Sequence, residues 1–108
     1  YGNPFTLVRR ENGCIIASVH IEARDMCDRS YAPWITSLYV KPEYRHRGIA
    51  TGLIRDALIL SSLPLFIYFK GTNHTFPSYI TASVVEEREY LNSIVTVYRL
   101  HKNANMFS

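Results

Sequence analysis

The chain has 108 residues, which is enough for one compact domain, and we treat residues 1–108 as such. Apolar residues make up 47% and charged residues 19%, which excludes a disordered or collagen-like chain. Twelve Lys and Arg against nine Asp and Glu give a net charge of +3, which suits a phosphate-bearing ligand. The cations are scattered, so nucleic acid is not an expected partner, and no apolar run approaches the roughly 20 residues of a membrane span.

The first half of the chain is predicted to form three strands. Residues 5–10 and 14–22 flank an Asn-Gly turn, which predicts an antiparallel hairpin. Residues 24–33 are polar and lack a period, as expected of a loop. Residues 34–40 are rich in β-branched and aromatic side chains and end at a Lys-Pro pair, which predicts a central strand.

The second half is predicted to contain one helix and three strands. Residues 48–62 carry apolar side chains at helical spacing, and residues 65–69 form a short apolar strand typical of a buried parallel arrangement. Residues 70–81 are ambiguous, because Gly71 and Pro77 would interrupt a helix there. The last hairpin pairs residues 84–90 with 94–100, and residues 101–108 form a frayed tail. This order predicts an α/β domain with one βαβ crossover.

The segment from residue 39 to residue 51 carries the clearest chemical signal. A strand ends, the basic turn Arg45-His46-Arg47 follows, and a helix begins at Gly48. The first turn of a helix has unpaired N–H groups and the positive end of the helix dipole, so this arrangement favours a diphosphate. Gly48 lets a ligand approach the backbone, and the Thr51 hydroxyl can reach a phosphate oxygen. The alternative is that the basic turn is only a run of charges in contact with solvent, which is the usual explanation when no other motif is present.

The spacing Arg45-x-x-Gly48-x-Ala50 resembles the acetyl-CoA signature of the GNAT superfamily of N-acetyltransferases. The stretch Pro33-Trp34-Ile35 resembles a bacterial-type subgroup. The resemblance implies a mixed, mostly antiparallel sheet whose two central strands splay apart, acetyl-CoA as cosubstrate, and acetyl transfer to a primary amine. The strand edge would pair with pantetheine, and the turn amides would hold the pyrophosphate. The implied acetyl-CoA site comprises Leu38, Tyr39, Val40, Arg45, His46, Arg47, Gly48, Ile49, Ala50 and Thr51.

Two departures from the family pattern affect the expected chemistry. The family usually places a Tyr after its fifth strand as general acid, and that position falls here at Phe76 or Pro77. Tyr79 is therefore the candidate acid, with a packed aromatic as the alternative. The family's first strand and first two helices are not recognisable. The acceptor site is then open, or a second copy in a homodimer completes it, or the chain is a fragment.

A general base must take a proton from an ammonium acceptor. Glu22 and Asp25 lie at the end of the predicted strand 14–22, and Glu86 and Glu87 lie in a later strand. Glu22 is the preferred candidate, although each carboxylate alone is more typical of a solvated surface. His20 is expected to be a hydrogen-bonded strand residue.

Two other functions stay open. A domain that binds acyl-CoA without turnover is favoured by Phe76, and a small basic module could bind nucleic acid through residues 41–47. The acceptor could be an antibiotic, a polyamine, an amino acid, a peptide N-terminus or a protein lysine. Cys14 and Cys27 fit neither metal-ligand spacing nor a disulfide framework, so we expect no metal and a cytoplasmic location.

Overall fold

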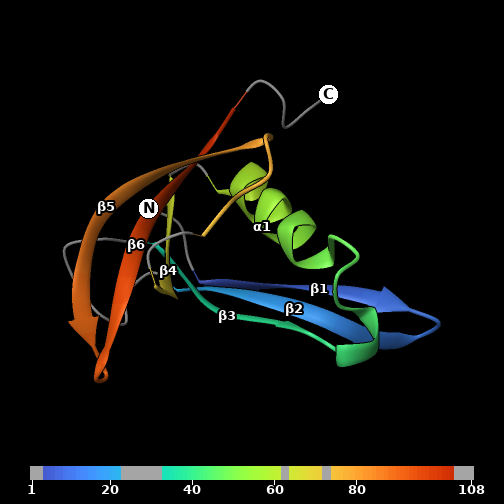
Figure 1. The fold of residues 1–108 in the computed structure, drawn as a ribbon. Helices are drawn as coiled ribbons and strands as arrows, with labels where there is room; N and C mark the ends of the chain where they lie inside the picture. The colour runs from blue at the N-terminus through green and yellow to red at the C-terminus, as the bar shows by residue number, and fades with distance from the viewer. Residues whose placement is uncertain (1–3, 23–32, 62–63, 72–73, 104–108) are drawn as a thin grey trace.

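The computed structural model describes residues 4–22, 33–61, 64–71 and 74–103. Within these ranges six strands form one sheet in the order β1-β2-β3-β4-β6-β5, and an α-helix, α1, connects β3 to β4 (Figure 1). Among the strand pairs of the described residues, only the β3–β4 contact is parallel, so the predicted mixed, mostly antiparallel sheet is confirmed. The elements are β1 Phe5–Glu11, β2 Cys14–Glu22, β3 Trp34–Val40, the 3₁₀ turn Pro42–Tyr44, α1 Ile49–Leu60, β4 Leu65–Lys70, β5 Ile80–Tyr90 and β6 Ser93–Lys102.

Two tight turns close the hairpins at the two ends of the sheet. Asn12 and Gly13 have φ values of 51° and 82°, and Leu91 and Asn92 have 51° and 63°. Two successive positive φ values are the pattern of a type I′ turn, whose twist matches that of the strands. The first hairpin was predicted correctly.

The second hairpin is longer than predicted at its open end, where both strands extend further. β5 begins at Ile80, not at residue 84, and β6 continues to Lys102. His101 is therefore part of a strand and not of a frayed tail. The reason is cross-strand pairing, because Ile80 lies opposite Lys102 and Ala82 opposite the buried Leu100. The rest of the predicted tail, residues 104–108, lies outside the described residues, as do residues 24–32 of the predicted loop.

Helix α1 covers one face of the sheet (Figure 1). It begins one residue later and ends two residues earlier than predicted, with Gly48 at its N-cap and Ser61 at its C-cap. Its buried side chains are Leu53, Ile54, Ala57 and Leu58. They share a core with Val19 and Ile21 of β2.

Trp34 anchors the opposite face of the sheet. It is fully buried, and its ring lies 5.9 Å from the rings of both Phe66 and Tyr68. The side chains of β2 alternate between the faces, so His20 and Glu22 lie on this side and Val19 and Ile21 lie on the side of α1.

The strands β3 and β4 meet at a single position and then run apart (Figure 1). Trp34 is opposite Phe66, and the Phe66 N–H donates to the Pro33 carbonyl at 3.0 Å. β4 instead pairs with antiparallel β6 at six positions, Leu65 to Lys70. β4 is thus parallel to β3, as the predicted βαβ crossover requires, and the implied splaying of these two central strands is confirmed, while most of the hydrogen-bonded pairing of β4 is with β6.

The ambiguous segment after β4 contains no helix in its described residues, which are 70, 71 and 74–81. Lys70 ends β4, Gly71 has a φ of 86°, and the Ile80 N–H donates to the Pro77 carbonyl at 3.0 Å. The left-handed conformation of Gly71 and the turn at Pro77 are both unfavourable for a regular helix at these positions.

Candidate functional site

The turn between β3 and α1 ends in a helix start, where backbone N–H groups lack partners within the helix. His46 and Gly48 have φ values of 65° and 77°, so the chain reverses sharply before the helix. The first intrahelical hydrogen bond runs from the Gly52 N–H to the Gly48 carbonyl at 3.0 Å. The N–H groups of Ile49, Ala50 and Thr51 therefore have no partner within the helix, and they form a site of positive potential.

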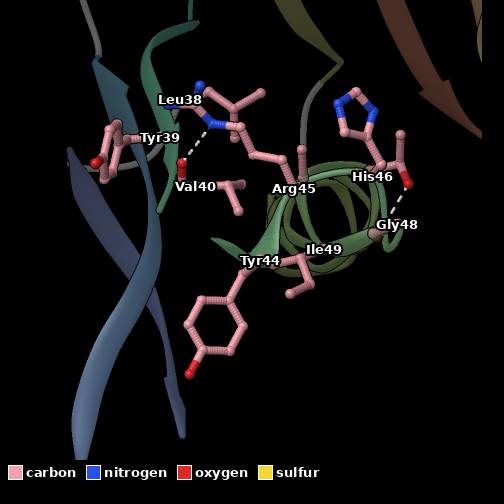
Figure 2. Close-up of a pocket in the computed structure, with 10 residues that line it drawn as sticks. Leu38, Tyr39, Val40, Tyr44, Arg45, His46, Gly48 and Ile49 are labelled. Atoms are coloured by element: carbon pink, nitrogen blue, oxygen red, sulfur yellow. Dashed lines mark hydrogen bonds between the residues drawn. The ribbon is translucent and has the colours of Figure 1, made fainter. Parts of the chain in front are cut away.

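Arg45 is tied back to the strand that precedes the turn (Figure 2). Its Nε donates to the Val40 carbonyl oxygen at 2.8 Å, and its guanidinium carbon lies 5.8 Å from the centre of the Tyr39 ring. This hydrogen bond uses Nε and leaves the two terminal nitrogens for an anion. Arg45 thus fixes the shape of the turn and brings positive charge to it.

Arg47 and Thr51, which the sequence predicted at the phosphate site, make contacts within the protein. The Arg47 guanidinium carbon lies 5.3 Å from the centre of the Tyr44 ring. The Thr51 hydroxyl donates to the Gly48 carbonyl at 3.1 Å, so its proton is not directed at a ligand in this structure. Arg47 therefore packs on the 3₁₀ turn, and Thr51 stabilises the helix start.

A cavity of about 390 Å³ lies at this turn (Figure 2). Nine of the ten residues predicted for the acetyl-CoA site line it, and Tyr44 takes the place of Arg47. Pro42 at the first position of the 3₁₀ turn signals the turn in the sequence. The inward position of Tyr44 depends on tertiary packing and had no sequence signal. The lining residues are Leu38, Tyr39, Val40, Tyr44, Arg45, His46, Gly48, Ile49, Ala50 and Thr51.

A second cavity, of about 250 Å³, lies where β3 and β4 run apart. It shares Leu38 with the first cavity, so the two follow each other along the edge of β3 that β4 leaves free. We call this second cavity the slot and the two together the groove. The slot is lined by Ile35, Thr36, Ser37, Leu38, Ile67, Tyr68 and Phe69.

The aromatic residues after β4 do not line either cavity. Phe76 packs edge-on against Phe69, with ring centres 6.0 Å apart, and Phe69 lines the slot. His74 stacks on Phe69 at 3.7 Å, and burial lowers the pKa of His74. Tyr79 packs against the core, with the Arg55 guanidinium of α1 5.8 Å from its ring centre.

The candidate base Glu22 is part of a hydrogen-bonded chain of three side chains. Glu22 Oε2 is 3.1 Å from His20 Nε2, and His20 Nδ1 is 2.7 Å from the Thr6 hydroxyl. His20 is therefore a hydrogen-bonded strand residue, as predicted. The other candidates lie elsewhere: Glu86 is 3.8 Å from Arg88 on β5, and Asp25 is outside the described residues.

Two further findings concern the described ranges only. No three side chains of His, Cys, Asp or Glu are grouped there as metal ligands would be. No helix there has the length and apolar character needed to cross a lipid bilayer.

Comparison with known proteins places this geometry in a family. A crystal structure described as a streptothricin acetyltransferase from Bacillus anthracis, in complex with acetyl coenzyme A, matches with a TM-score of 0.69 at 10% identity. The match covers 95% of this chain, which spans 65% of that chain, so it shows a shared fold. No curated protein matches the sequence. The acetyltransferase (GNAT) family model matches residues 1–61, more than half of the chain, and the protein therefore belongs to the GNAT family.

Proposed function

We propose that the protein transfers an acetyl group from acetyl-CoA to a primary amine. The observation that carries this proposal is the groove along β3, which begins at the basic turn before α1 and ends in the slot. Its two ends offer different chemistry. One presents N–H donors and cations to an anion, and the other is a largely apolar gap between two strands.

The groove fits the parts of acetyl-CoA in order. The diphosphate binds the N–H groups at the start of α1, together with the free guanidinium nitrogens of Arg45. A Cβ on Gly48 would meet only Thr51 Oγ1, at 4.0 Å, so the space in front of this glycine is open to a ligand. The pantetheine chain pairs with the free edge of β3, and the thioester enters the slot.

The reaction is a direct transfer. The ammonium of the acceptor loses a proton, with Glu22 as the candidate base, and the free amine attacks the thioester carbonyl carbon. The C–N bond forms, the C–S bond breaks, and backbone N–H groups of β3 polarise the carbonyl oxygen. Tyr79 or a water molecule then protonates the departing thiolate.

A binding titration followed by a turnover assay tests this function. Calorimetry should show that CoA binds to the folded wild-type protein. Release of CoA thiol from acetyl-CoA should then require an added amine. Spermidine, lysine, a peptide with a free N-terminus and streptothricin sample the acceptor classes, and the last is suggested by the name of the structural neighbour. Failure of the folded protein to bind CoA would remove the basis of the proposal.

The second candidate function is binding of acyl-CoA without turnover. It is favoured by Phe76, which occupies the region of the family's general acid and packs into an aromatic cluster with Phe69 and Tyr98. The same two measurements separate the candidates. Tight CoA binding without thiol release in the presence of any of the four amines favours the binding domain.

We also propose a homodimer, because large apolar side chains are exposed on the β5–β6 hairpin. Leu91 is 79% exposed, Val84 61% and Ile94 53%. Surfaces of this kind are commonly covered by a symmetric contact. Sedimentation equilibrium at micromolar concentration should give twice the monomer mass, and a monomer throughout would refute the dimer.

A cytoplasmic setting is proposed only from the cosubstrate and the two cysteines.

A further inference from the structure

The chain of Thr6, His20 and Glu22 has the arrangement of a histidine base held by two partners. Thr6 lies directly opposite His20 in the β1–β2 register, and Glu22 follows two residues later on the same face. An ionised carboxylate can only accept, so His20 Nε2 carries a hydrogen and donates it to Glu22 across 3.1 Å. Nδ1 is then the unprotonated nitrogen, and it accepts the Thr6 hydroxyl hydrogen across 2.7 Å. A base whose second ring nitrogen is held by a carboxylate is a common arrangement in sites that deprotonate a nucleophile.

The position of His20 relates it to the slot. His20 is directly opposite Ser37 in the β2–β3 register, and Ser37 lines the slot. Both positions lie on the face opposite α1, on neighbouring strands whose backbones are roughly 4.8 Å apart. The side chains of His20 and Glu22 are 33% and 37% exposed, so a solute on this face can reach them.

We propose that His20 is the proton acceptor for the amine substrate and that Glu22 is a positioning residue. This inference rests on the proposed function and refines the role of Glu22 within it. The ammonium proton passes through water to His20 Nδ1, and the Thr6 hydroxyl turns to accept the new N–H. The resulting imidazolium donates one N–H to Glu22 and the other to Thr6, so both hydrogens are satisfied. The deprotonated amine attacks the thioester, and the imidazolium returns its proton to water.

The charges around His20 are consistent with this role. β1 presents Thr6 and Val8 on this face, and β3 presents Ser37 and Tyr39. On β2 itself the neighbour is Glu22. Among these described neighbours Glu22 is the one acidic side chain, and it is within hydrogen-bond distance of His20 Nε2.

The test measures the pH dependence of acetylation with acetyl-CoA and whichever of spermidine, lysine and streptothricin releases CoA fastest. At pH 7 the substitution His20→Gln should lower kcat about 100-fold, the typical contribution of a positioned base. The KM for acetyl-CoA should change less than about twofold. At the pKa of the amine itself, about 10.4, half of the substrate is already deprotonated and the deficit should shrink to a few-fold. A structural defect would not recover with pH.

Three further variants complete the design. Glu22→Gln and Thr6→Val should each give a smaller deficit with the same recovery at high pH, and they test the proposal if His20→Gln does not fold. His101→Gln on β6 is the matched control and should behave as wild type. A deficit that is equal at all pH values, or absent, overturns the role of His20 while acetylation by the wild type still stands. If the wild type acetylates none of the amines, the proposed function fails, and this inference fails with it.

Discussion

The two ends of the groove are built in different ways. The end at the helix comes from one continuous segment, residues 38–51, in which a strand edge, a 3₁₀ turn and a helix start follow one another. The slot is assembled from β3 and β4, and its neighbours come from β2 and from the residues after β4. The first end depends on local backbone geometry, and the second depends on how two halves of a sheet diverge.

In the proposed function, this difference separates ligand binding from chemistry. Substitutions at the helix end should act mainly on the affinity for CoA, whereas substitutions at the slot should act mainly on turnover. Two fragments of the cosubstrate probe the ends separately: adenosine 3′,5′-bisphosphate reports on the helix end, and pantetheine reports on the slot. The predictions below use this separation.

Gly48→Glu should have the largest effect. A negatively charged side chain in front of the helix start would repel the diphosphate, and we expect CoA affinity to fall more than about 100-fold, or about 2.7 kcal/mol. Gly48 also has a φ of 77°, so any side chain there is strained. Gly13→Glu is the matched control, because Gly13 has a φ of 82° and lies in the β1–β2 turn, away from the groove. Equal calorimetric losses in the two variants would show that strain, not the site, is responsible.

Ser37→Phe should reduce turnover while leaving nucleotide binding at the helix end unchanged. A phenyl ring at the slot would displace the thioester, and misplacement by an ångström costs about 100-fold in rate. Binding of adenosine 3′,5′-bisphosphate should stay within about twofold of wild type, since the helix end is untouched. Ser83→Phe, at an exposed position of β5, is the control. Loss of nucleotide binding in Ser37→Phe would mean that the ends are not independent.

Arg45 and Arg47 should differ, although both belong to the same basic turn. Arg45→Ala removes the hydrogen bond to Val40 and a phosphate ligand, and should weaken CoA binding by about 1.5–3 kcal/mol. Arg47 packs on Tyr44 outside the cavity lining, so Arg47→Ala should cost less than about 1 kcal/mol. Calorimetric titration of both variants decides the order, and the reverse order would contradict the assignment of Arg45.

Tyr79→Phe tests the proposed general acid. If Tyr79 protonates the thiolate, removal of its hydroxyl should slow acetyl transfer at least about tenfold at unchanged CoA affinity. An unchanged rate would leave Tyr79 as a packing residue beneath Arg55. Phe76→Tyr is the complementary variant, and faster turnover there would place the missing hydroxyl in the aromatic cluster beside the slot.

Acidification should have the smallest effect and should act on the slot end. Burial lowers the pKa of His74 below its ordinary value of 6.5, so the folded state binds fewer protons than the unfolded state below that pH. The free energy of unfolding should therefore fall as the pH drops below 6.5, and His74→Gln should reduce the slope. Burial and the charge of Arg99 also lower the pKa of His101, so His101→Gln is needed as a comparison. Urea unfolding of both variants and the wild type at several pH values measures the slopes.

The bounds of the elements at the helix end could be predicted from the sequence because their determinants are local, whereas the ten residues proposed to hold acetyl-CoA came from the family resemblance. The Asn-Gly turn sets the start of β2, and the Lys-Pro pair sets the end of β3, both at the predicted residues. Gly48 marks the helix start. The placement of Arg47 could not be predicted, because its contact with Tyr44 depends on how the 3₁₀ turn packs.

The slot end was predicted only through the family resemblance. Nothing in β4 itself signals that it pairs with β3 at one position and with β6 at six. The start of β5 was missed because Thr81, Ala82 and Ser83 are small or polar, and their strand conformation depends on pairing with β6. The chain of Thr6, His20 and Glu22 joins residues from two strands and becomes visible only once the register of the hairpin is known.

The single pairing of Trp34 with Phe66 also has a consequence for how the chain folds. The β1–β2 and β5–β6 ladders are each closed by a two-residue turn, so their contacts are local in sequence and low in loop-closure entropy. The Trp34–Phe66 contact instead joins residues on either side of the whole α1 crossover. We therefore expect the two hairpins to form early in folding and the Trp34–Phe66 contact to form late. Conservative substitutions at Phe66 should then change the unfolding rate and leave the folding rate nearly unchanged, which is a kinetic φ-value near zero.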